Sequence, residues 1–199
     1  MDYSYELRAM EQGFKIVCGV DEAGRGPLAG PVYAAAVILP TGLQIPGLND
    51  SKKLSEKKRE ELFDIITQKA ISYSIGIATE REIDEINILN ATFLAMKRAV
   101  DGLEICPDYA IIDGNREPHT GIFEETVVKG DGKVMSVAAA SILAKVSRDR
   151  FMLEMAEKYP QYQFEKHKGY GTKLHYEMIS QYGVSPIHRR SFLKKMVGE

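Results

Sequence analysis

The sequence predicts an α/β domain in which helices flank a mixed, five-stranded sheet. Two observations favour this fold: five short apolar or β-branched runs alternate with segments of helical periodicity, and the order along the chain is β-β-α-β-α-β-β-α. A third observation concerns domain number. The 199 residues show no repeat, low-complexity tract or linker, so we expect residues 1–199 to form a single domain.

Five segments are predicted as strands, at residues 16–20, 32–39, 72–78, 109–113 and 126–129. Residues 72–78 alternate apolar and small polar side chains, which is typical of a half-buried strand. The last two segments are short apolar runs that follow helical or loop segments, which indicates buried strands of the parallel type. The sheet is therefore expected to be mixed.

Four segments are predicted as helices. Residues 54–69 form the first, with Ser55 as a candidate N-cap, and Thr79-Glu80-Arg81-Glu82 matches a capping box that begins the second, which runs to about Val100. The Ala-rich segment 134–158 has strong helix propensity and forms the longest helix. A shorter C-terminal helix at 172–181 and a basic tail at 189–197 complete the chain.

Composition limits the class of protein. The chain is 44% hydrophobic and 27% charged, and its longest apolar run, residues 32–39, is far too short to span a bilayer. The first fifteen residues contain no apolar leader segment, and Cys18 and Cys106 share no CxxC spacing. We therefore expect a cytoplasmic protein with no membrane partner, no disulfide and no zinc site.

Charge is distributed unevenly between the two parts of the chain. Residues 1–125 hold 13 Lys and Arg against 21 Asp and Glu, whereas residues 126–199 hold 13 against 7. This distribution would suit a protein that binds cations with one part and a polyanion with the other. Ordinary solvated faces explain the imbalance equally well.

Acidic residues follow three of the predicted strands. Asp21 and Glu22 end the first strand, Asp113 ends the fourth, and Asp131 lies just past the fifth. Since ligand sites form at the carboxyl edge of α/β sheets, these side chains are expected to meet there. Four carboxylates in one place repel one another unless a cation compensates, and an all-oxygen ligand set suits Mg²⁺ or Mn²⁺.

Adjacent strand residues point to opposite faces, so Asp21 and Glu22 could not share an ion on a regular strand. We expect the segment Ala23–Pro27 to let the backbone leave the pleat at Glu22. A lone Asp-Glu pair would more often be a solvated turn, and the coincidence of three strand ends favours the metal site.

The same glycines permit another interpretation. Gly24–Ala29, GRGPLA, fits the dinucleotide-binding fingerprint, but a strand rather than a helix is predicted after it, and the preceding acids would repel a pyrophosphate. A third hypothesis, an interaction module with an acidic patch, explains neither the glycines nor the basic C-terminal part.

Six motifs in order resemble those of the type 2 ribonucleases H, the ribonuclease HII family. They are GVDEAGRGPLAGPV, LNDSKKLS, NILNAT, IIDGN, KGDGKVMSVAAASILAKVSRDR and HKGYGT, and the resemblance covers residues 16 to about 192. The resemblance implies a ribonuclease H-like fold with C-terminal helices. It also implies an endonuclease that cuts the RNA strand of RNA/DNA hybrids and cuts 5′ to single ribonucleotides in duplex DNA, leaving 5′-phosphate and 3′-hydroxyl ends.

The resemblance also assigns residues. It implies that Asp21, Glu22, Asp113 and Asp131 hold two Mg²⁺ or Mn²⁺ ions, that Gly24, Arg25 and Gly26 contact the ribose, and that Tyr170 lies against the next sugar. Type 3 enzymes carry an extra N-terminal domain, which we do not find, and no sliding-clamp-binding tail is evident after Phe192. We expect a monomer of type 2.

Further candidates carry open alternatives. Arg25 either contacts phosphate or supports the loop, and Lys52 and Lys53 resemble backbone-contacting lysines of the family. Ser141, Lys145 and Arg148 share one helix face that either contacts phosphates or is merely solvated. Asn87 and Asn90 either reach nucleic acid or face solvent. We interpret His167 and His175 as structural or phosphate-adjacent, and His119 and His188 carry no signal.

Overall fold

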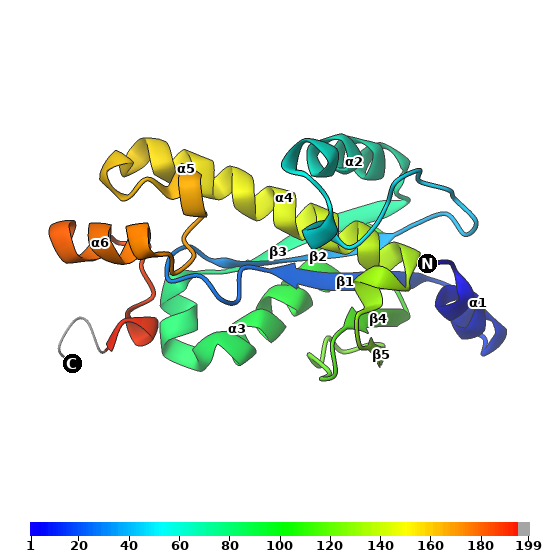
Figure 1. The fold of residues 1–199 in the computed structure, drawn as a ribbon. Coiled ribbons are helices and arrows are strands. Elements are labelled where there is room, and N and C mark those ends of the chain that lie inside the picture. The colour runs from blue at the N-terminus through cyan, green and yellow to red at the C-terminus, as the bar shows by residue number, and fades with distance from the viewer. Residues whose placement is uncertain (195–199) are drawn as a thin grey trace.

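The five predicted strands form one sheet with helices on both faces (Figure 1). The structure is a computed structural model that describes residues 1–194. The strands are β1 (Val17–Ala23), β2 (Val32–Ile38), β3 (Ser72–Ala78), β4 (Tyr109–Asp113) and β5 (Phe123–Val127). The helices are α1 (Ser4–Glu11), α2 (Glu56–Lys69), α3 (Glu80–Asp101), α4 (Met135–Lys158), α5 (Phe164–His167) and α6 (Lys173–Tyr182).

The strand order is β3-β2-β1-β4-β5, with β1 at the centre. Strand β2 runs antiparallel to both β1 and β3, whereas β1, β4 and β5 are parallel to one another. The prediction of a mixed, five-stranded sheet is confirmed. Because β1, β4 and β5 are parallel, their carboxyl ends meet at one edge, which is the arrangement that the predicted site requires.

Two apolar layers hold the helices on the sheet. Alternate side chains of β2 pack against α3 on one face and against α2 and α4 on the other, as the period of a strand dictates. A Cβ on Gly19 in β1 would lie 2.3 Å from the backbone of Ser136, so this glycine lets α4 approach β1 closely. The close approach places the N-terminal half of α4 beside the carboxyl end of β1.

Element boundaries follow the sequence signals closely. Ser55 caps α2, Thr79 and Glu82 form a complete capping box at α3, and Thr172 caps α6. Helices α1 and α5 were not predicted; α5 is a single turn of four residues, too short for a periodic pattern. Strand β5 also lies earlier than predicted, because the chain turns at Lys129, where φ is +59°.

The basic tail is only partly described. Residues 190–192 form a short 3₁₀ turn, and positions 195–197 of the predicted tail lie outside the described residues. Within residues 1–194, no helix is both long and apolar enough to cross a membrane.

Candidate active site

The carboxyl edge of the parallel strands gathers the four predicted acids. Asp21 and Glu22 lie near the end of β1, Asp113 is the last residue of β4, and Asp131 lies in a 3₁₀ turn just after β5. The amide of Gly130 donates to Oδ1 of Asp113 at 2.7 Å and ties the last two segments together. The sheet topology thus brings together side chains that are far apart in the sequence.

The expected departure of the backbone from the pleat at Glu22 is wrong. Strand β1 stays paired with β2 through Ala23, and Asp21 and Glu22 do point to opposite faces. Asp21 lies on the α4 side near Ser141, and Glu22 lines a cavity of about 350 Å³ beside α3. Both still interact with Asp113, because β4 pairs with β1 only as far as Val20 and ends at Asp113.

Burial and mutual repulsion destabilise the charged form of these acids. Burial, then the charge of Glu22, then that of Asp113 raise the pKa of Asp21 well above its ordinary value. Burial raises the pKa of Glu22 despite the opposing charge of Arg25, and burial followed by Asp113 raises the pKa of Asp131. A cluster with raised pKa values favours a bound cation that pairs with the carboxylates.

Lysine and aspartate from the loop before α2 complete the cluster. Nζ of Lys52 lies 3.9 Å from Oδ2 of Asp131. Burial opposes the charge of this lysine, but the nearby acids, Asp21 first among them, raise its pKa overall. Asp50, which the sequence analysis missed, interacts with Asp131 and accepts a hydrogen bond from the Lys52 amide at 2.9 Å. Its signal was its place in the LNDSKKLS motif.

The four acids form an open cluster. Among residues 1–194, the one group of three ligand-type side chains whose atoms all lie within 4.8 Å of one another is Glu117, His119 and Glu124, on the β4–β5 connection and in β5. That group is mostly exposed, and Glu124 already accepts hydrogen bonds from the His119 and Thr120 amides. The oxygen-only donor set of the strand ends fits Mg²⁺, which is commonly bound by few carboxylates together with waters and substrate phosphates.

The glycine loop and Tyr170 lie side by side. A Cβ on Gly26 would approach only the Tyr170 ring, at 3.9 Å, and both residues line a cavity of about 250 Å³ together with Glu22, Lys52 and Lys145. The Tyr170 ring is 40% exposed, and Nζ of Lys145 lies 5.8 Å from its centroid. Arg25 is exposed, with Nη1 3.4 Å from Oε1 of Glu22. The predicted loop and tyrosine therefore face one cavity that Glu22, one of the four acids, also lines.

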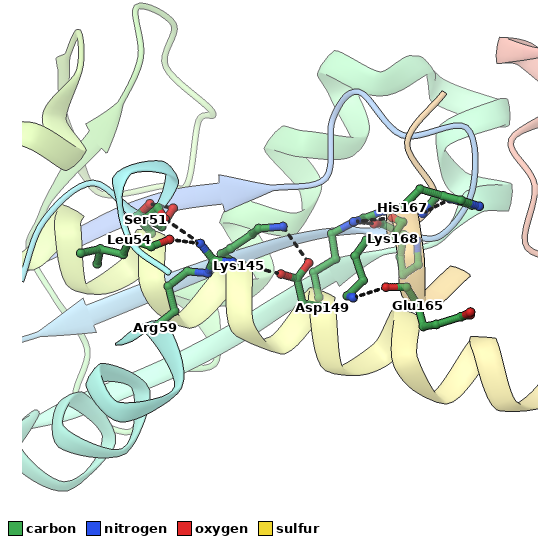
Figure 2. Close-up of polar contacts among 12 residues, drawn as sticks. Ser51, Leu54, Arg59, Lys145, Asp149, Glu165, His167 and Lys168 are labelled. Carbon is green, nitrogen blue, oxygen red and sulfur yellow. Dashed lines mark hydrogen bonds and ion pairs between the residues drawn. The ribbon is translucent and has the colours of Figure 1, made fainter. Parts of the chain in front are cut away.

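The expected cationic face of α4 is largely covered. Lys145 donates to Asp149 at 2.7 Å, and Asp149 also lies 3.9 Å from Arg59 of α2 (Figure 2). Arg59 in turn donates to the backbone carbonyls of Ser51 and Leu54. These contacts fix the loop that carries Lys52 against α4. Sequence reasoning missed Arg59 and Asp149, because nothing in their local sequence distinguishes them from other charged helix residues.

Arg148 fits neither of the two alternatives that its place on α4 left open, a phosphate contact or a solvated face. It is fully buried, and its guanidinium donates to the carbonyls of Ala29, Pro31 and Lys168. One helix face can be half covered by another part of the chain, and here the glycine loop and the Lys168 segment cover it. In this geometry Arg148 supports the loop from beneath instead of reaching a phosphate.

The remaining polar candidates have structural contacts. Asn87 has φ +68° at a kink in α3, and its Oδ1 accepts hydrogen bonds from the Leu89 and Asn90 amides, which caps the second half of the helix. The imidazoles of His167, His175 and His188 are buried together, and the last two lie 3.0 Å apart through their Nε2 atoms. Nδ1 of His188 contacts the amide and the hydroxyl of Ser185, contacts for which the sequence gave no signal.

Known proteins resemble this chain in both sequence and fold. The family model described as Ribonuclease HII matches residues 18–195. Ribonuclease HII of Endomicrobium trichonymphae is 59% identical over 96% of this chain and 91% of its own, and that of Caldicellulosiruptor bescii is 53% identical over 98% and 95%.

A solved structure agrees with these relatives. The ribonuclease H2 crystal structure from Pyrococcus horikoshii OT3 superposes with a TM-score of 0.74 at 30% identity, covering 89% of this chain and 93% of that one. The prediction of a ribonuclease H-like α/β fold is confirmed, and so is that of an endoribonuclease acting on nucleic acid. The chain belongs to the ribonuclease HII family.

Proposed function

We propose that this chain cuts duplex DNA on the 5′ side of single embedded ribonucleotides, as well as the RNA strand of RNA/DNA hybrids, with two divalent ions. The observation that carries the proposal is that Glu22 lines both the cavity beside Asp113 and the cavity that the glycine loop shares with Tyr170. The bound metal ions and the groups that recognise the sugar would then contact the same ribonucleotide and the phosphate beside it.

The acids fit the chemistry of such ions. When bound, Mg²⁺ or Mn²⁺ ions would activate the attacking water and stabilise the leaving 3′-oxygen of an in-line displacement. Asp21, Glu22, Asp113 and Asp131 supply only hard oxygen donors. Burial first, and neighbouring carboxylates after it, raise the pKa values of Asp21, Glu22 and Asp131, so a bound cation would favour their charged forms. Lys52, whose Nζ lies 3.9 Å from Oδ2 of Asp131, would contact a phosphate that enters the same edge.

Sugar recognition divides between two elements. Gly24, Arg25 and Gly26 let the backbone approach a 2′-hydroxyl, which is the group that distinguishes RNA from DNA. Tyr170, beside Gly26, offers a flat ring to the following deoxyribose, which lacks the 2′-oxygen that would hold the ring away. Together they would select a ribonucleotide followed by a deoxyribonucleotide.

The dinucleotide-binding alternative receives no support from the fold. After the GRGPLA segment the chain enters strand β2, so no helix N-terminus is available to bind a pyrophosphate.

We also propose a single-domain monomer that acts in the cytoplasm. One sheet organises the described residues, and Cys18 and Cys106 are both free thiols.

A cleavage assay tests the proposed function. The substrate is a DNA duplex with one ribonucleotide, the control is the same duplex entirely of DNA, and products are mapped at nucleotide resolution with Mg²⁺, Mn²⁺ or EDTA. We expect one metal-dependent cut 5′ to the ribonucleotide and an intact control. Cleavage of the all-DNA duplex, or no cleavage of the duplex with one ribonucleotide, would contradict the proposed substrate choice.

A further inference from the structure

Two fully buried arginines lie beneath the glycine loop, and neither is used by the chemistry described above. Arg148 comes from α4 and Arg189 from the segment after α6, and both side chains are 0% exposed. Their six side-chain hydrogen bonds all end on backbone carbonyls. Arg189 donates to Gly24 at 2.6 Å, Arg25 at 2.9 Å and Gly30 at 2.8 Å. A buried guanidinium in this arrangement serves to fix the course of the chain.

The contacts of Arg189 determine which way two peptide groups face. The chain contains no cis peptide bond among its described residues, so each carbonyl points opposite to the N–H of the next residue. The carbonyls of Gly24 and Arg25 point inward to Arg189, and hence the N–H groups of Arg25 and Gly26 point away from it. Gly24, Arg25 and Gly26 line the cavity shared with Tyr170, which is the open space beside these peptide groups.

Arg148 and the backbone hold the Tyr170 segment to the same loop. Arg148 bridges the carbonyls of Ala29 and Lys168, and the Leu28 amide donates to Gly169 at 2.8 Å. Gly24, at φ +95°, leaves room for this arginine, because a Cβ there would lie 2.1 Å from Nε of Arg148. The backbone of Arg189 also donates to Leu28 at 2.8 Å. The loop and the tyrosine thus form one supported unit.

We propose that Arg189 is a positioning residue that aims the amides of Arg25 and Gly26 at the 2′-oxygen of the substrate, and so sets the preference for ribose over deoxyribose. The inference deepens the proposed function and rests on it. It also specifies the groups that the loop offers to the ribose: the carbonyls of Gly24 and Arg25 face Arg189, so the groups on the other side are the N–H donors of Arg25 and Gly26.

The test compares affinities in the absence of cleavage. In an Asp113→Asn chain with Mg²⁺, fluorescence anisotropy gives Kd for a duplex with one ribonucleotide and for its all-DNA counterpart. Arg189→Met removes all three donors, Arg189→Lys keeps the charge without the three-pronged geometry, and Arg190→Met is the matched control on the exposed neighbour. Thermal melts report folding for each chain.

We expect Arg189→Lys and Arg189→Met to lower the ratio of the Kd for the all-DNA duplex to the Kd for the single-ribonucleotide duplex by about fivefold or more, because two aimed donors are lost. The affinity for the all-DNA duplex itself should change little. Arg190→Met should keep the parental ratio. Should Arg189→Met fail to fold, Arg189→Lys carries the test. A parental ratio in folded Arg189→Lys would overturn the inference alone. No ribose preference in the parent would instead overturn the proposed function together with the inference.

Discussion

Two neighbouring glycines of the loop should respond in opposite ways to the same substitution. Gly24 is buried at φ +95° above Arg148, whereas Gly26 is exposed, has no positive φ, and would place a Cβ 3.9 Å from Tyr170 with nothing nearer. Alanine at each position therefore separates the support of the loop from its contact with substrate. The comparison is internal, since the added group is one methyl in both cases.

For Gly24→Ala, the left-handed backbone costs roughly 1–2 kcal/mol. The clash with the hydrogen-bonded Arg148 adds roughly 1–3 kcal/mol. A total of about 2–5 kcal/mol lowers Tm by roughly 4–20 °C in a chain of this size. For Gly26→Ala, the methyl finds space in the free chain, and the loss of unfolded-state entropy stabilises by about 0.4–1 kcal/mol. Its Tm should be equal to or slightly above that of the parent.

The cleavage rate of Gly26→Ala should fall even though its Tm does not. The Gly26 methyl enters the space where the ribose would lie, and a displacement of about 1 Å at a reacting centre can reduce the rate on the order of 100-fold. Single-turnover cleavage of a single-ribonucleotide duplex, with melts of the same samples, measures both effects. Near-parental cleavage by Gly26→Ala, or a loss that follows a lowered Tm, would refute the reasoning.

The remaining predictions concern charge, protonation and the tyrosine. Asp21→Asn should lower kcat by orders of magnitude. In metal-free buffer it should unfold at higher temperature than the parent at pH 7, because the raised pKa of the native carboxyl costs stability once the pH exceeds its ordinary value; melts from pH 7 downward should show the difference vanish as the pH falls to that ordinary value. Tyr170→Ala should cut cleavage at a single ribonucleotide by more than about tenfold with little change in Tm, whereas Tyr170→Phe keeps the ring and most of the activity; equal losses in both would contradict a role for the flat ring. Burial lowers the pKa of His175 and of His188 to about 4, so denaturant titrations should show stability falling as pH drops from about 6.5 to about 4, and falling less in His175→Gln; identical pH curves would contradict this assignment.

Periodic patterns and strand-end residues predicted most of the fold. Strands β1 to β4 and the four longer helices occupy their expected segments, because each is marked by alternation, by a capping residue or by composition, whereas β5 overlaps its predicted segment by only two residues. The acids could be found for a related reason: a carboxylate that ends a buried strand is unusual in sequence, and the parallel order of β1, β4 and β5 then brings three such ends together.

Contacts between distant segments were out of reach of the same patterns. Helical spacing placed Arg148 correctly on α4, but it could not show that residues 29–31 and Lys168 would cover that face. Arg189 is part of the predicted basic tail, and its contact with Gly24 could not be predicted because 165 residues along the chain separate it from that carbonyl. Asn87 was identified as unusual for a helix, and its role in capping the kink depends on a backbone conformation that no spacing reveals.

The central claim is that divalent ions held by the strand-end acids contact the phosphate that is cleaved. Replacing a non-bridging oxygen of the phosphate 5′ to the ribonucleotide by sulfur tests it, because Mg²⁺ binds sulfur poorly and Mn²⁺ binds it better. We predict that single-turnover cleavage of at least one sulfur diastereomer slows strongly in Mg²⁺ and recovers in Mn²⁺. Equal rates for sulfur- and oxygen-containing duplexes in both metals would contradict the claim.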